Sequence, residues 1–398
     1  ELPLARVLGE MELCGFSADV NGLKALSSEL DTRIKALESD IYSLVGYEFN
    51  LNSPKQLGVA LFEKLGLPAK KKTKSGYSTG AEVLEGLKNE HPAVSLLLNY
   101  RQLAKLKSTY ADGLQDCIAE DGRIHSTFNQ TEARTGRISS LEPNLQNIPV
   151  RTAEGRRLRE YFNAPAGRVL CDADYSQIEL RVLASMSGDT NMINAFGSGT
   201  DIHTVTASQV FGLPQDMITP ELRSRAKAVN FGIVYGIGAF SLSKDIGVTR
   251  AEADRYIKSY LAAYPGVAAY MEKAIEDAKK NGFVTTLYGR RRYIPELSNS
   301  NGNMRAFGER VARNAPIQGT AADIIKIAMI KVSRSLKDEF PTARLILQVH
   351  DELIVECDEK DAEGVCELLE REMENAADLA VRLTAEAHFG KTWLEAKA

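Results

Sequence analysis

Two aspartates in distant parts of the chain stand where apolar strands are predicted to end. Asp174 follows the apolar stretch 168–173, and Asp351 lies in the turn between the apolar runs 345–349 and 353–355. If the two strands are neighbours in one sheet, both carboxylates converge on one point, where their like charges require a cation. Hard oxygen ligands at a sheet edge favour Mg²⁺, which also takes phosphate oxygens and water. The simpler alternative is that each acid faces solvent near a turn.

A second pattern combines cations and aromatic rings at helical spacing. Arg223, Lys227, Phe231 and Tyr235 recur every four residues, so on a helix they form one stripe. The cations are suited to holding a triphosphate, and the rings to stacking on a sugar or a base. Alternatively the rings belong to the core and the cations to solvent. Neither a dinucleotide-binding glycine fingerprint nor a phosphate-loop GK[ST] motif occurs in the sequence.

Planar polar side chains form a third pattern, in a loop after Thr135 and on a helix after Arg310. Such groups can reach phosphates and the minor-groove acceptors that every base pair shares. Building turns is the alternative role for Asn and Pro. We expect Pro316 to kink or interrupt the helix. The candidates for DNA contact are Arg137, Asn144, Gln146, Asn147, Arg151, Arg310, Asn314 and Gln318.

The elements that must position these residues are mixed in type. Apolar spacing predicts helices over about 22–110, 202–281 and 305–336, and strands and loops over 121–184. Capping boxes are predicted at Ser53, Thr79 and Thr249, and a cap at Thr219 before Pro220. Lys70–Gly76 is predicted to be a basic tip between two helices. An α+β fold follows.

Composition limits the class of protein. At 398 residues the chain is long enough for two or three units, and it lacks the ~20 uninterrupted apolar residues of a membrane span. It also lacks a secretory signal and an initiator Met, so we interpret it as a soluble fragment. Five scattered cysteines without a CxxC pair indicate a reducing cytoplasm. The net charge of −4 does not favour nucleic-acid binding, but Lys70–Lys74, Arg151–Arg159 and Arg290–Arg292 are concentrated basic segments.

Three short motifs of the chain together resemble those of a known family. Asp174–Arg181, Arg223–Gly236 and Gln348–Glu352 are similar to motifs A, B and C of the family A DNA polymerases, the bacterial DNA polymerase I type, in the family's order. The resemblance extends from Pro3 to Trp393. It implies a right-hand fold with an antiparallel-sheet palm, helical fingers and a helical thumb. The expected division is a palm-associated segment 1–19, thumb 20–110, palm 111–187, fingers 188–301 and palm 302–398.

The resemblance also implies roles for individual residues. Asp174, Asp351 and the backbone carbonyl of Tyr175 are expected to bind two Mg²⁺ ions, which Mn²⁺ can replace, with Glu352 as an accessory acid. Lys227 is expected to protonate the departing pyrophosphate. Glu179 is expected to be the steric gate that excludes a ribose 2′-hydroxyl. The incoming dNTP is expected to contact Gln177, His203, Arg223, Lys227, Phe231 and Tyr235, and His350 joins the DNA contacts named above.

The implied activity is template-directed extension of a primer from dNTPs, with release of pyrophosphate, in DNA replication and repair. The expected partners are primer-template DNA and dNTPs, with no membrane, and the expected form is a monomer in the bacterial cytoplasm, associated with the nucleoid. The smaller Gly197–Gly199 loop departs from the family pattern and puts loop contacts there in doubt. Because the chain begins where the polymerase part begins, we expect no proofreading domain in it.

Three alternatives make different predictions. A single-subunit RNA polymerase must admit a 2′-hydroxyl, which Glu179 and Phe231 oppose. A two-metal nuclease has no triphosphate to hold with the stripe 223–235. A non-catalytic DNA-binding module has no need of Asp174 or Asp351.

Overall fold

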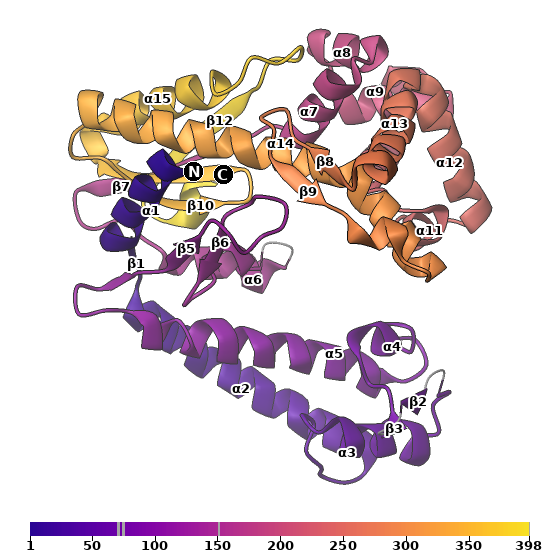
Figure 1. Cartoon of the computed structure of the whole chain (residues 1–398). Helices are drawn as coiled ribbons and strands as arrows, with labels where there is room; N and C mark the ends of the chain where they lie inside the picture. The colour runs from indigo at the N-terminus through magenta and orange to yellow at the C-terminus, as the bar shows by residue number, and fades with distance from the viewer. Residues whose placement is uncertain (70–71, 74–75, 150–151, 398) are drawn as a thin grey trace.

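The computed structural model describes residues 1–69, 72–73, 76–149 and 152–397 (Figure 1). Helices and small antiparallel sheets are mixed along the chain, as the predicted α+β class requires. The α-helices are α1 (Leu2–Cys14), α2 (Val20–Val45), α3 (Pro54–Gly58), α4 (Ala81–Glu85), α5 (Pro92–Lys105), α6 (Ala153–Arg157), α7 (Ile178–Ser187), α8 (Thr190–Gly197), α9 (Ile202–Phe211), α10 (Pro220–Val234), α11 (Ala239–Asp245), α12 (Arg250–Ala263), α13 (Pro265–Asn281), α14 (Gly302–Glu339), α15 (Ala362–Glu374) and α16 (Trp393–Ala396). The strands are β1 (Phe16–Ser17), β2 (Lys72–Thr73), β3 (Gly76–Tyr77), β4 (Arg123–Ile124), β5 (Thr127–Asn129), β6 (Ser139–Leu141), β7 (Arg168–Tyr175), β8 (Phe283–Thr285), β9 (Arg291–Tyr293), β10 (Arg344–Val349), β11 (Glu352–Asp358) and β12 (Ala385–Gly390).

The central sheet has four antiparallel strands in the order β10-β11-β7-β12. The predicted hairpin is confirmed as β10 and β11, with His350 and Asp351 in its turn. The predicted strand before Asp174 is confirmed as β7, and β11 is its neighbour, with Glu352 opposite Asp174. Both strands are almost wholly buried, because helices cover the sheet and leave little of it to solvent.

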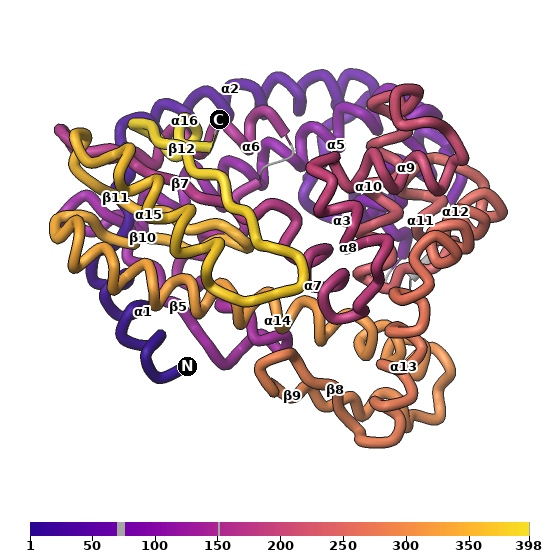
Figure 2. The backbone as a smooth tube through the Cα atoms, turned by 90° about the horizontal axis from the view of Figure 1, so that it is seen from above, coloured from indigo at the N-terminus to yellow at the C-terminus, as the bar shows by residue number. Residues whose placement is uncertain are grey.

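Two helices, α14 and α15, pack together on the sheet, and α15 covers β7 and β12 (Figures 1 and 2). The prediction that Pro316 interrupts the helix is wrong, because α14 runs through it from Gly302 to Glu339. The carbonyl of Pro316 accepts a 2.7 Å hydrogen bond from Thr320 Oγ1, and Pro316 is buried. Packing along the long buried face therefore outweighs the backbone hydrogen bond that proline removes.

Residues 20–110 form a long arm in which α2 and α5 lie side by side (Figure 1). Leu23, Leu26 and Leu30 of the predicted apolar stripe are buried on α2. Ser53 caps α3 as predicted, but Gln56 completes no box because its Oε1 accepts from the backbone of Asn50.

The capping box predicted at Thr79 is wrong. Gly80 is the N-cap of α4, and no side chain caps that helix. The hydroxyl of Thr79 instead accepts a long hydrogen bond from Arg101 on α5, at 3.5 Å. The tertiary contact with α5 has thus replaced the local cap.

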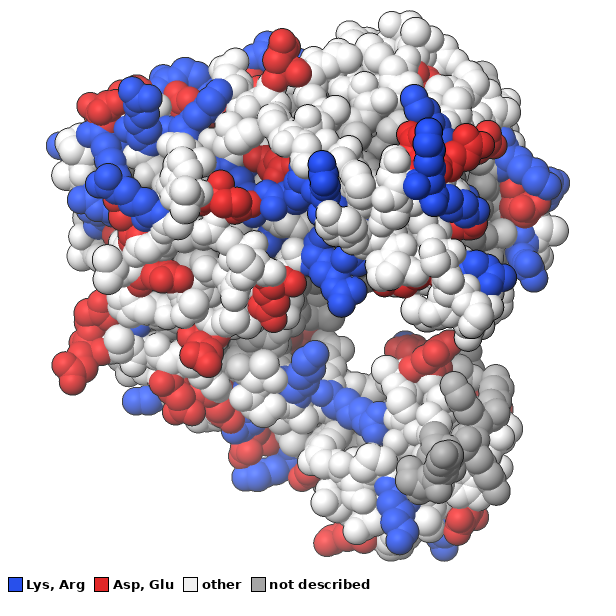
Figure 3. Space-filling model, in the orientation of Figure 1, with Lys and Arg blue, Asp and Glu red and all other residues white. Residues whose placement is uncertain are grey.

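Helices α8 to α13 form a second lobe, followed by the β8–β9 hairpin that returns to α14 (Figure 1). The predicted cap at Thr219 before Pro220 and the predicted capping box of Thr249 with Glu252 are both confirmed. An opening lies between this lobe and the arm, with Lys and Arg side chains along part of its rim (Figure 3), and Lys244 of α11 pairs with Glu82 of α4, near the end of the arm, at 3.3 Å. Within the described residues, every helix is too short or too polar to span a lipid bilayer.

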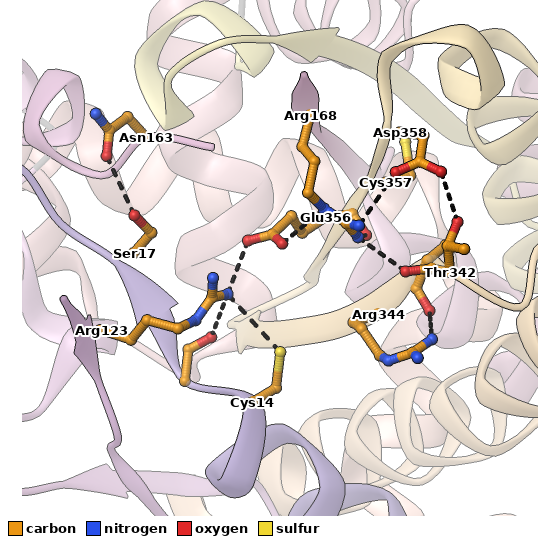
Figure 4. A network of polar contacts seen from close by, with 12 residues as sticks. Cys14, Ser17, Arg123, Asn163, Arg168, Thr342, Arg344, Glu356, Cys357 and Asp358 are labelled. Atoms are coloured by element: carbon orange, nitrogen blue, oxygen red, sulfur yellow. Dashed lines mark hydrogen bonds and ion pairs between the residues drawn. The ribbon is translucent and has the colours of Figure 1, made fainter. Parts of the chain in front are cut away.

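Buried charges join the N-terminal segment to the central sheet (Figure 4). Glu356 on β11 pairs with Arg123 on β4 at 2.7 Å and with Arg168 on β7 at 2.8 Å. Arg123 also donates to the carbonyl of Gly15, just before β1, at 3.0 Å. One buried carboxylate thus holds two cations from segments that are far apart in sequence.

Candidate active site

The two predicted metal-binding aspartates lie at one edge of the central sheet. Asp174 is the penultimate residue of β7, and Asp351 lies in the turn just before β11. The backbone N–H of Tyr175 donates to the carbonyl of Asp351 at 3.1 Å, which fixes the ends of the two strands together. Burial raises the pKa of Asp351, partly opposed by Arg137 and reinforced by the charge of Asp174.

Glu352, the predicted accessory acid, is buried directly opposite Asp174. The indole Nε1 of Trp393 donates to Glu352 Oε1 at 3.3 Å, and Lys397 Nζ donates to Glu352 Oε2 at 2.5 Å. Lys397 Nζ also donates to Asp174 Oδ2 at 2.9 Å. Sequence reasoning missed Lys397, because no local pattern links the end of the chain to the sheet.

Asp172 is a second residue that sequence reasoning missed. It lies two positions before Asp174, on the same face of β7, and is 2% exposed. Trp393 Nε1 donates to its Oδ2 at 3.2 Å, while its buried Oδ1 has no hydrogen bond. Burial and the neighbouring Glu352 carboxylate raise the pKa of Asp172 to about 8. The two-residue spacing of the aspartates was the signal that could have found it.

This edge has the chemistry of a site for hard divalent cations. Among the described residues, no cluster of three or more His, Cys, Asp or Glu side chains surrounds one metal position. Mg²⁺ does not need one, because it binds through one or two carboxylates and fills its other positions with water and phosphate oxygens. Asp174 and Asp351 supply two carboxylates at the ends of neighbouring strands, and no other described side chain donates to Asp174 Oδ1 or to the Asp351 carboxylate. The residues present therefore fit Mg²⁺.

Arg223, Lys227 and Phe231 of the predicted stripe lie on α10, in the second lobe, and Tyr235 is the C-cap of that helix. Arg223 makes two 2.9 Å hydrogen bonds to Asp201, the N-cap of α9. Lys227 is exposed and makes no ion pair with any other described residue. Phe231 and Tyr235 are stacked, with centroids 6.2 Å apart, and Tyr235 is 39% exposed. The alternative in which both rings belong to the core is thus wrong for Tyr235.

His203 lies behind this stripe and is 2% exposed. Its Nδ1 lies 3.0 Å from the Asn230 side-chain amide, and its ring is 6.0 Å from that of Phe231. Burial lowers the pKa of His203 to about 4. The imidazole is therefore neutral at pH 7, and any phosphate contact it makes is that of a neutral donor.

Glu179, the predicted steric gate, lies at the start of α7 and is buried. Its Oε1 accepts from Arg137 at 2.8 Å, while its buried Oε2 has no hydrogen bond. Burial raises the pKa of Glu179, and Arg137 opposes that rise. Gln177 precedes it as the N-cap of α7, in the left-handed conformation with φ 55°.

Two of the loop residues predicted to read DNA, Arg137 and Gln146, lie near Asp351. Arg137, Gln146, His350 and Asp351 line one small cavity. The side chain of Gln146 donates to the backbone and side-chain oxygens of Gln348 at 3.1 and 3.2 Å.

Two neighbouring candidates have turn-building roles as well. The exposed Asn144 accepts from the Gln146 backbone and so caps a short 3-10 turn, which is the alternative role weighed for this residue. The side chain of Asn147 is exposed, while its carbonyl accepts from Tyr110. Arg151 and most of the basic tip Lys70–Gly76 lie outside the residues whose side chains the structure describes.

Arg310, Asn314 and Gln318 are all on α14, four residues apart, so they share one face of the helix. Arg310 is exposed and lies over the ring of Phe307. The buried Oδ1 of Asn314 has no hydrogen bond. An unpaired buried acceptor costs free energy unless a ligand pairs with it.

Comparison with known proteins assigns this architecture to a class. The POL domain of Pol1 from M. smegmatis, solved in complex with DNA primer-template and dNTP, matches with a TM-score of 0.94 at 45% identity. That match covers 100% of this chain and 70% of the other. The fold is therefore the right-hand polymerase fold that the sequence predicts.

The family follows from the sequence comparisons. The model of DNA polymerase family A matches residues 20–395. DNA polymerase I of Geobacillus stearothermophilus is 50% identical over 399 residues, and that of Bacillus subtilis is 52% identical over 400 residues. Each match covers 100% of this chain, and 46% and 45% of those proteins. This chain belongs to DNA polymerase family A, and it spans a little under half the length of these relatives.

Proposed function

We propose that this chain is the polymerase region of a bacterial-type DNA polymerase that extends a primer from dNTPs, in DNA replication and repair. The single observation that carries the proposal is the pairing of β7 with β11. This pairing brings Asp174 and Asp351 to one sheet edge although 176 residues separate them in the sequence. The chain also carries a cationic and aromatic helix face on α10 and a set of planar polar groups, of which Arg137 and Gln146 lie beside Asp351. These groups suit a triphosphate and a duplex.

Asp174, Asp351 and the carbonyl of Tyr175 would hold two Mg²⁺ ions, or Mn²⁺ in their place. When bound, such ions lower the pKa of the primer 3′-hydroxyl and neutralise charge on the triphosphate and the departing pyrophosphate. Lys227, exposed and without an ion-pair partner among the described residues, is free to hold the phosphates and to give a proton to pyrophosphate. Arg223 exchanges its Asp201 partner for phosphate oxygens.

Glu179 and the rings of α10 select the nucleotide on this proposal. The buried carboxylate of Glu179 occupies the space that a ribose 2′-hydroxyl would need, so deoxynucleotides are favoured. Phe231 packs against the sugar and Tyr235 lies beside the templating base. Gln177 and the neutral His203 complete the nucleotide contacts.

The duplex contacts in the proposal come from the loop after Thr135, the hairpin turn and α14. Arg137 and Gln318 test the geometry of the base pair in the minor groove without reading sequence. Residues 20–110 then act as the thumb, 188–301 as the fingers, and 1–19, 111–187 and 302–398 as the palm. The enzyme works as a monomer at the chromosome, in the bacterial cytoplasm.

A primer-extension assay with and without Mg²⁺ tests the proposal. Wild-type protein is expected to extend a primed template, and Asp174→Ala and Asp351→Ala are each expected to abolish extension while duplex binding persists. Asp378→Ala, in the loop before β12, is the matched control and should extend normally. A nuclease would shorten the primer, and a binding module would leave it unchanged. Normal extension by either aspartate variant would refute the metal assignment.

A further inference from the structure

The last residues of the described chain reach into the acidic edge of the sheet. The helix α16 begins at Trp393, which is fully buried against Phe16 and Phe162. A Cβ added at Gly390 would lie 2.4 Å from Glu395 Cβ, so β12 and α16 are packed as closely as a glycine permits. This packing holds α16 against β12 and β7, directly before Lys397.

Lys397 is the cation at the centre of three carboxylates, those of Glu352, Asp174 and Asp172. Its Nζ lies 2.5 Å from Glu352, 2.9 Å from Asp174 and 3.8 Å from Asp172. Burial opposes its charge, but these carboxylates outweigh burial and raise the pKa of Lys397. Its side chain is 28% exposed, so the charge pairs are only partly screened by water.

The acceptors in this cluster are unequally occupied. Both oxygens of Glu352 are taken, one by Trp393 and one by Lys397. Oδ2 of Asp174 is also taken by Lys397. Among the described residues, none donates to Asp174 Oδ1 or to the carboxylate of Asp351. These oxygens are available to coordinate a metal ion, whereas both oxygens of Glu352 already accept hydrogen bonds.

We propose that Lys397 is a positioning residue that holds Asp174 and Glu352 and weakens the binding of divalent metal ions at Asp174 and Asp351. The inference rests on the metal site of the proposed function. A fixed positive charge beside one metal ligand repels an incoming cation and occupies one of the oxygens that could coordinate it. The site then binds metal ions weakly until triphosphate oxygens add negative charge and further ligands.

Mn²⁺ binding to the 398-residue chain, followed by electron paramagnetic resonance without DNA or nucleotide, tests this role. Lys397→Gln removes the charge and keeps most of the stem, so it is expected to bind Mn²⁺ about five- to tenfold more tightly. Lys397→Arg keeps the charge and should remain close to wild type. Asp174→Ala in the Lys397→Gln background should abolish the gain, which assigns the gain to this site.

Lys391→Gln is the matched control, since Lys391 pairs with the exposed Glu359 at 2.7 Å on the same C-terminal segment. Its Mn²⁺ affinity should equal that of wild type. Melting curves of each variant verify folding, and Lys397→Met carries the same prediction if Lys397→Gln does not fold. Unchanged or weaker Mn²⁺ binding by a folded uncharged variant would overturn the role of Lys397. As long as wild type extends primers, unchanged Mn²⁺ binding by the variant leaves the proposed function intact. If wild type does not extend primers, the proposed function is itself refuted.

Discussion

Glu179 and Arg137 form an ion pair at 2.8 Å that joins the proposed nucleotide pocket to the proposed minor-groove contacts. The pair links the start of α7 to a loop 42 residues earlier in the sequence. It holds the carboxylate of Glu179 in one place, which a steric gate requires.

Replacement of Glu179 by Ala is expected to raise the ratio of ribonucleotide to deoxynucleotide incorporation by at least about tenfold, because it opens the space for a 2′-hydroxyl. Single-nucleotide incorporation with paired ribo- and deoxynucleotides measures the ratio. Glu179→Gln keeps the volume and loses the charge, so it should keep most of the discrimination. An unchanged ratio in Glu179→Ala would show that Glu179 is not the steric gate.

Lys227→Ala is expected to raise the KM for dNTP more than Arg223→Ala does. Arg223 must give up two hydrogen bonds to Asp201 before it can bind phosphate, whereas Lys227 has no such partner among the described residues. Steady-state extension with varied dNTP measures both variants. Lys258→Ala, an exposed lysine paired with Asp254 on α12, should leave KM unchanged. Equal rises in KM for the two variants would show that the hydrogen bonds to Asp201 do not weaken phosphate binding by Arg223.

His203 is expected to make stability depend on pH between about 4 and 6.5. The unfolded chain binds a proton on this ring near pH 6.5, whereas burial lowers the folded pKa to about 4. The free energy of unfolding is therefore highest above pH 6.5. It falls by at most about 3 kcal/mol as the pH drops towards 4, because protons then bind to the unfolded chain and not to the folded ring. Urea unfolding of wild type and His203→Gln at pH 7.5 and pH 5 tests this, and the variant should lose less stability on acidification. Identical losses in the two proteins would contradict the assignment.

Glu356 is expected to be the most costly carboxylate to neutralise outside the proposed active site. Glu356→Gln leaves Arg123 and Arg168 without their buried partner, which should lower the free energy of unfolding by about 3 kcal/mol. Glu359→Gln loses only an exposed pair with Lys391 and should cost under about 0.5 kcal/mol. Urea unfolding measures both. A similar, small cost for each would show that the pairs with Glu356 contribute little.

Local patterns predicted most of the elements that carry the site. The strand before Asp174, the hairpin around Asp351 and the helical stripe on α10 are confirmed, because each depends on side-chain periodicity within one short segment. The capping box predicted at Thr79 and the interruption predicted at Pro316 were wrong for a common reason. In both places a tertiary contact or a long buried face outweighed the local preference of one residue.

By itself the sequence determined the types of the reactive groups, the elements on which they lie and, through its motifs, the family. Only the tertiary structure decided which charges face one another. Lys397 meets Asp174 across 223 residues, and Asp201 pairs with Arg223 from a different helix. Such pairs leave no local period in the sequence, because they depend on how whole elements pack and on loops that close between distant segments.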